Sequence, residues 1–194
     1  MAAHRLIIIP GYGDRTGYIH RLTGSWLRRY GVEVEVVTFG WRGDSRSYDQ
    51  KWQAFIAHLD RSNPAVVLGI SAGASVALRA LTEEPQKVLG VVSICGPWTG
   101  RYFHADVMHT QYPTLESSLA PLRPTKFPVN RILTFRPLYD ETATTKAVSI
   151  EGAQNVRMPF AFHAVSIVLA LVFYGQTISK FVKTPYNVPK AGDS

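Results

Sequence analysis

Residues 66–78 of this chain read VVLGISAGASVAL. The apolar run that ends at Gly69 indicates a strand buried on both faces, and the alanine-rich run after Ser71 has the composition of a helix. Between them lies the pentapeptide Gly69-Ile70-Ser71-Ala72-Gly73. A serine on a tight strand-to-helix turn has a strained backbone and needs small neighbours. We therefore expect the Ser71 hydroxyl to stand clear of the sheet at the positive end of a helix, where negative charge is stabilised.

The rest of the chain alternates strand-like and helix-like segments. Amphipathic helices are predicted at residues 18–30 and 52–59, and an apolar helix is predicted from His163 onward. Short apolar runs predict further strands at residues 6–9, 32–39, 88–94, 132–135 and 147–150. Strands that are apolar on both faces and alternate with helices are typical of an α/β fold. We predict one domain over residues 1–194, with a mainly parallel six-stranded sheet and helices on both of its faces.

Residues 96–129 interrupt this alternation, because they carry five prolines and five aromatic residues. A segment of this length is unusual for a simple connection. We expect a small cap over the carboxyl ends of the strands, with an irregular surface loop as the alternative. Trp98, at the start of the segment, is a candidate substrate contact, as is Ile70 beside the serine.

The composition of the chain bears on which partners, cofactors and cellular location are expected. The 194 residues carry a formal net charge of +7, but the basic residues are scattered and form no nucleic-acid-binding motif. The apolar segment at residues 160–174 is too short to span a membrane. With a single cysteine, Cys95, and no export signal, a cytoplasmic location is expected. His104, Asp106 and His109 lack a fourth ligand nearby, so neither a metal nor another cofactor is expected.

A serine hydroxyl becomes a good nucleophile when a base removes its proton and a third group orients the base. Of the six histidines, His163 begins the final apolar helix and is placed at the carboxyl edge of the sheet, where ligands collect in open α/β folds. Asp140 follows the fifth strand to the same edge, and Glu141 is the alternative carboxylate. The alternatives are that Asp140 only forms a turn, that Ser71 is inert and that His163 is a capped or core histidine.

The strand-serine-helix motif and the order Ser71, Asp140, His163 resemble the α/β-hydrolase superfamily, and the resemblance covers nearly the whole chain. It implies a compact member with sheet order 2-1-3-4-5-6 that lacks the first two antiparallel strands of the full-length fold. It also implies that Ser71, Asp140 and His163 are the nucleophile, the acid and the base.

The same resemblance implies an oxyanion hole formed by the backbone N–H groups of Ala72 and Tyr12. The loop Pro10-Gly11-Tyr12-Gly13 is similar to the family's loop after the first strand, but it lacks the His-Gly-Gly-Gly motif of one lipase and esterase branch.

The implied activity is hydrolysis of a small-molecule carboxylic ester through an acyl-enzyme. Thioesterase, amidase and acyltransferase activities use the same triad and remain open alternatives. A catalytically silent hydrolase fold that serves as a binding module is the alternative from another class. The sequence leaves the oligomeric state open.

Overall fold

The computed structural model describes residues 4–12, 24–60, 63–99, 113–122 and 126–186. Six strands form one sheet in the order β2-β1-β3-β4-β5-β6, and every neighbouring pair is parallel. The predicted parallel sheet and its strand order are therefore confirmed. The strands are β1 (His4–Ile9), β2 (Val32–Val36), β3 (Ala65–Ile70), β4 (Val88–Ile94), β5 (Ile132–Arg136) and β6 (Gln154–Arg157).

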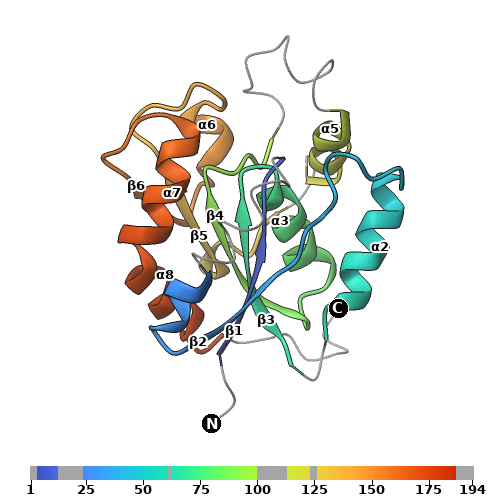
Figure 1. The fold of residues 1–194 in the computed structure, drawn as a ribbon, viewed down its shortest axis with the longest axis horizontal. Coiled ribbons are helices and arrows are strands. Elements are labelled where there is room, and N and C mark those ends of the chain that lie inside the picture. The colour runs from blue at the N-terminus through green and yellow to red at the C-terminus, as the bar shows by residue number, and fades with distance from the viewer. Residues whose placement is uncertain (1–3, 13–23, 61–62, 100–112, 123–125, 187–194) are drawn as a thin grey trace.

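Helices cover both faces of the sheet, as predicted (Figure 1). On one face, α2 (Tyr48–His58), α3 (Gly73–Glu83) and α5 (Pro113–Leu119) pack on the sheet through a common apolar cluster. On the other face, α7 (His163–Phe173) and α8 (Gly175–Val182) form a second cluster with the sheet. The central strand β3 is buried along its whole length because helices lie on both of its sides.

The helix predicted at residues 18–30 is observed only in part. Residues 24–28 are helical, and residues 13–23 lie outside the described part of the chain. The second predicted helix is present as α2, which begins four residues earlier than expected. Its start is fixed by Ser47, whose side chain accepts from the Gln50 N–H while the Gln50 side chain accepts from the Ser47 N–H.

The sixth strand was predicted in the wrong place. Residues 145–148 form the short helix α6 (Thr145–Val148), and the strand at the sheet edge is β6, which begins only after the predicted strand at residues 147–150 has ended. The apolar pair Ala147 and Val148 packs in a small cluster of its own with Ala143, which a single helical turn satisfies. In β6 only one residue is even half-buried, so the strand shows no apolar run.

The segment predicted as a cap is described only in part, because residues 100–112 and 123–125 lie outside the described residues. Its described portion contains α5 and the short 3-10 helix η3 (Ala120–Leu122), and a second 3-10 helix, η4 (Val129–Arg131), begins at its last residue. Leu115, Leu119 and Leu122 are buried in the cluster shared with α2 and α3. This portion therefore packs on the helical layer beside α3 (Figure 1). Whether the segment covers the site remains a prediction.

Candidate active site

The predicted turn between β3 and α3 is present, with Ser71 at its apex. Ser71 has a φ of 50°, in the left-handed region that residues with a Cβ rarely adopt. A Cβ on Gly69 would lie 2.3 Å from Cα of Ala74, and one on Gly73 would lie 2.3 Å from the carbonyl oxygen of Ile9. Glycine is therefore required at both positions for α3 to start this close to β1 and β3.

Three predicted side chains meet at the carboxyl edge of the sheet. His163 Nε2 lies 2.9 Å from Ser71 Oγ, and His163 Nδ1 lies 2.9 Å from Asp140 Oδ2. The three residues come from the turn after β3, the loop after β5 and the first position of α7. The side chain of Asp140 is 4% exposed and that of His163 is 14% exposed. The carboxylate is thus shielded from water while the imidazole keeps an open edge.

The second carboxylate oxygen of Asp140 is held by the backbone of its own loop. Oδ1 accepts from the N–H groups of Thr142 at 2.8 Å and Ala143 at 3.0 Å. An aspartate that bonds to the backbone two and three residues further on is the turn residue that the sequence left open. Both descriptions of Asp140 hold at once, because one oxygen builds the turn and the other faces His163.

Glu141, the alternative carboxylate, does not contact the imidazole. Its Oε2 accepts from the backbone N–H of His163 at 2.9 Å. It therefore satisfies one of the free N–H groups in the first turn of α7 and places a negative charge at the positive end of that helix.

The loop after β1 lies directly against the serine. A Cβ on Gly11 would be 2.8 Å from Ser71 Cβ, so the backbone that leads into Tyr12 passes beside the hydroxyl. Trp41 fixes this loop by donating from Nε1 to the Pro10 carbonyl at 3.0 Å. Ala72, the next residue after Ser71, is the N-cap residue of α3. That the N–H groups of Ala72 and Tyr12 donate to an oxyanion stays a prediction.

The two predicted substrate contacts, Trp98 and Ile70, differ in how deeply they are buried. Trp98 is half-buried, donates from Nε1 to the Ser149 carbonyl at 2.8 Å and packs edge-on against Phe127. Ile70 is 2% exposed and belongs to the core beneath α7 and α8. Its side chain is therefore not part of an open surface at the site.

Cys95 is a neighbour of the site that the sequence analysis did not assign to it. It follows β4 directly, has a φ of 51° and is fully buried. Its Sγ and the ligand atoms of Asp140 and His163 all lie within 4.8 Å of one another, a spacing at which a metal can bind. Burial, reinforced by the charges of Asp140 and Glu141, raises the pKa of the Cys95 thiol, so the thiol is protonated in this structure. His104, Asp106 and His109 lie outside the described residues.

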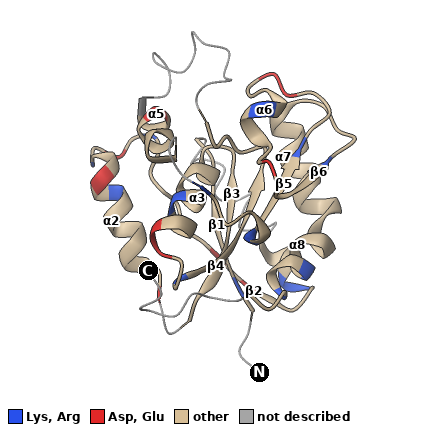
Figure 2. Ribbon diagram, turned by 180° about the vertical axis from the view of Figure 1, so that it is seen from behind, with Lys and Arg blue, Asp and Glu red and all other residues tan. Residues whose placement is uncertain are grey.

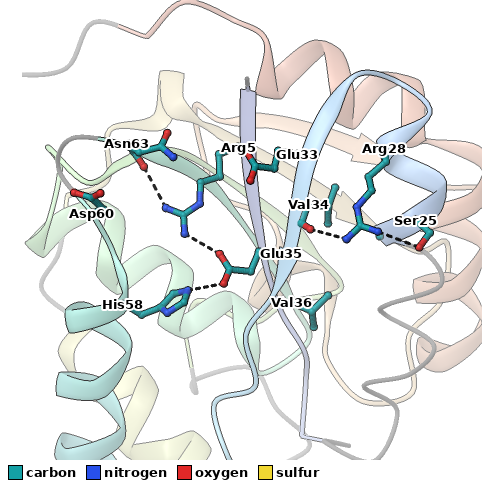
Figure 3. Close-up of a pocket in the computed structure, with 11 residues that line it drawn as sticks. Arg5, Ser25, Arg28, Glu33, Val34, Glu35, Val36, His58, Asp60 and Asn63 are labelled. Carbon is teal, nitrogen blue, oxygen red and sulfur yellow. Dashed lines mark hydrogen bonds and ion pairs between the residues drawn. The ribbon is translucent and has the colours of Figure 1, made fainter. Parts of the chain in front are cut away.

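A separate cavity of about 830 Å³ lies along the edge strand β2 and contains none of the predicted site residues (Figure 3). Glu35 is at its centre, bonded to Arg5 at 2.7 Å and to His58 at 3.0 Å. Burial alone would raise the pKa of Glu35, but the bonds to Arg5 and His58 outweigh it and lower the pKa. The carboxylate therefore stays charged as part of an ion network that ties β1, β2 and α2 together.

Among the described residues, no single helix is long and apolar enough to cross a membrane. The pair α7 and α8 reaches the required length and composition only together, and it is bent by 67°.

The chain was compared with protein families, with curated proteins and with solved structures. A model of the alpha/beta hydrolase family matches residues 6–177. No curated protein matches the sequence.

Solved structures that resemble the chain include one reported for the metagenome-derived lipolytic enzymes LipS and LipT, with 10% identity, a TM-score of 0.66 and coverage of 92% of this chain and 93% of that one. A hydrolase from Oleispira antarctica has 12% identity and a TM-score of 0.65, with coverage of 93% of this chain and 91% of that one. The type II thioesterase of the yersiniabactin pathway has 15% identity and a TM-score of 0.57, with coverage of 92% of this chain and 93% of that one. At these identities, the structures share the fold.

Proposed function

Because the chain belongs to the α/β-hydrolase family, we propose that it is a serine hydrolase that cleaves small carboxylic esters. The observation that carries the proposal is the unbroken series of hydrogen bonds from Asp140 through His163 to Ser71. A buried carboxylate, an imidazole and a serine in this order are the parts that acyl transfer needs.

In the proposed reaction His163 accepts the Ser71 proton through Nε2 while Ser71 Oγ attacks the ester carbonyl. The N–H groups of Ala72 and Tyr12 would stabilise the oxyanion, and each such donor contributes about 10²–10³ in rate in other serine hydrolases. His163 then protonates the departing alcohol, and the same base activates the water that hydrolyses the acyl-enzyme. Asp140 keeps the proton on Nδ1, so that Nε2 is free to accept.

Thioester hydrolysis is the second candidate, because a thioesterase is among the structures that share this fold. Amidase and acyltransferase activities need the same triad but differ in the leaving group and in the access of water. A ladder of acyl chain lengths, offered as oxygen esters and as thioesters, separates these activities by kcat/KM. A cytoplasmic location is also part of the proposal, and it rests on the single cysteine of the chain.

The first test is labelling with a fluorophosphonate, followed by peptide mass spectrometry. An adduct on Ser71 that is absent in Ser71→Ala and much slower in His163→Ala is the expected result. Ser45→Ala, which removes an exposed serine outside the site, is the matched control and should label normally. If the folded protein forms no adduct, the proposal of an activated serine is overturned in favour of a binding module.

A further inference from the structure

The outer face of α7 is apolar and uncovered by any described residue. Val165, Val168 and Val172 recur along one side of the helix with exposed fractions of 42–51%, and Phe173 at its end is 67% exposed. The helix contains no Asp, Glu, Lys or Arg over its eleven residues. The outer face of a helix in a globular protein ordinarily carries charged or polar residues. An exposed apolar face of this kind indicates a binding surface.

This surface continues from α7 to the edge of the candidate active site. Leu138, Tyr139 and Phe162 are each more than half exposed, and the rings of Tyr139 and Phe162 lie edge to face at 6.0 Å. These three residues, with the four on α7, are called the apolar face below. They include seven of the eight large hydrophobic side chains that are exposed among the described residues.

Phe162 links the apolar face to the chemistry, because it directly precedes His163. Its φ of 71° is strained for a residue with a Cβ. Its own N–H donates to the Tyr139 carbonyl, and its carbonyl accepts from Ser166 in α7. The backbone around the strained residue is therefore held on both sides, with its aromatic ring exposed next to the triad.

The charged residues around the apolar face indicate the kind of surface that it binds. Residues 152–186, which include β6, α7 and α8, contain no Asp or Glu, and their cations Arg157, Lys180 and Lys183 are all exposed. Figure 2 shows basic residues on α8 and at β6 with no acidic residue between them. The carboxylates Asp140 and Glu141 are both bonded to His163, and the exposed Glu151 directly precedes these residues. The whole chain carries +7, so two copies would repel each other, whereas an anionic surface would attract the protein.

We propose that the apolar face docks the protein on an anionic lipid surface. In this arrangement α7 lies in the plane of the interface, with its valines and the rings of Phe162 and Phe173 among the acyl chains and the basic residues near the headgroups. This inference concerns binding, goes beyond the proposed ester hydrolysis and does not depend on it.

The test is co-sedimentation with vesicles of phosphatidylcholine alone and with about 30 mol% phosphatidylglycerol. The protein used is the 194-residue chain with Ser71→Ala, so that no catalysis is involved. Adding Val168→Gln and Val172→Gln should weaken partition onto the anionic vesicles about tenfold. Glutamine is a better helix former than valine, so α7 should persist, which circular dichroism checks.

The matched control is Ala54→Gln with Ala57→Gln on the exposed side of α2, on the opposite layer of the molecule (Figure 1). It should bind as well as the parent protein. A second variant, Arg157→Gln with Lys180→Gln, should weaken binding to anionic vesicles and reduce its salt dependence.

Partition that is lost in the valine variant and kept in the α2 control supports the proposal. Absence of binding to anionic vesicles overturns it, and so does equal binding by the valine variant and its parent. A dimer in analytical ultracentrifugation that the valine variant abolishes, without vesicle binding, would assign the apolar face to a second copy of the chain and also overturn the proposal.

Discussion

Glu141 accepts a hydrogen bond from the backbone N–H of His163, with 2.9 Å between Oε2 and N. The preceding residue, Asp140, holds the imidazole of the same histidine at Nδ1. Two consecutive carboxylates thus fix one histidine at two points, one on the ring and one on the main chain. Asp140 therefore orients the imidazole, whereas Glu141 fixes the main chain of the residue that bears it. A substitution at either carboxylate removes one of these two contacts and leaves the other.

Asp140→Asn is expected to lower kcat/KM by about 10⁴ if the triad acts as proposed. Oδ1 faces two N–H donors, so an asparagine would turn its carbonyl toward Thr142 and Ala143 and its NH₂ toward His163. The imidazole would then carry its proton on Nε2, where it cannot accept one from Ser71. Hydrolysis of p-nitrophenyl acetate measures the loss, and an unchanged melting temperature would show that the fold persists. Activity within tenfold of the parent would contradict the proposed role of Asp140.

Glu141→Ala is expected to lower kcat about tenfold with little change in KM, because the first turn of α7 would no longer be anchored and His163 would move. Loss of a carboxylate at a helix N-terminus should also lower the free energy of unfolding by about 0.5–1 kcal/mol. Glu141→Gln keeps an oxygen acceptor for the His163 N–H and should restore most of the activity. If the alanine and glutamine variants lose activity equally, Glu141 does not act by positioning His163.

The sequence was sufficient for those parts of the fold that depend on burial and on short-range sterics. The strands β3 and β4 are buried on both faces, so their apolar runs identified them, and the small residues around Ser71 identified the turn. Cys95 and the contact of Glu141 with His163 could not be predicted, because both arise where segments distant in sequence meet at the sheet edge. Their only sequence signal was proximity to the ends of predicted strands.

Gly73→Ala should destabilise the protein by about 3 kcal/mol or prevent folding, because the new Cβ would lie 2.3 Å from the backbone oxygen of Ile9. A suitable control is Gly43→Ala. Gly43 has a φ of 73° and no heavy atom within 4 Å of its Cβ position, so alanine costs only the backbone term of about 1 kcal/mol. Urea unfolding followed by tryptophan fluorescence compares the two. Equal losses would show that the close contact of α3 with β1 adds nothing to the requirement for glycine.

Cys95 should resist alkylation by iodoacetamide at pH 8 in the native protein and react readily in denaturant. Its raised pKa, caused by burial and by Asp140 and Glu141, keeps the thiol protonated when folded, whereas in the unfolded chain it ionises near pH 8.5. The unfolded state alone then loses a proton above that pH, so the free energy of unfolding should fall as pH rises. Cys95→Ala should reduce this fall. Rapid modification of the native protein would contradict the burial of the thiol.

The edge strand β6 was missed for a related physical reason, since polar contacts rather than apolar alternation hold it. Asn155 is the centre of these contacts. Its Oδ1 accepts from Thr134 Oγ1 at 2.7 Å and from the Ile150 N–H at 3.1 Å, and its Nδ2 donates to the carbonyls of Ile150 and Ala153. The hydrophobic pattern of a sequence does not reveal hydrogen bonds of this kind around one asparagine. The apolar residues at 147–150, just before β6, predicted a strand instead.

Asn155→Ala is therefore expected to lower the free energy of unfolding by about 2–3 kcal/mol, because it leaves the hydroxyl of Thr134 and the peptide groups of Ile150 and Ala153 without these partners. Gln154→Ala, one residue earlier on the same strand and exposed, is the matched control and should change stability little. Urea unfolding measures both variants. If Asn155→Ala is as stable as Gln154→Ala, pairing with β5 alone holds β6 in place and the hydrogen bonds of Asn155 contribute nothing. If it unfolds earlier, the segment that leads from β6 to His163 depends on a single amide side chain.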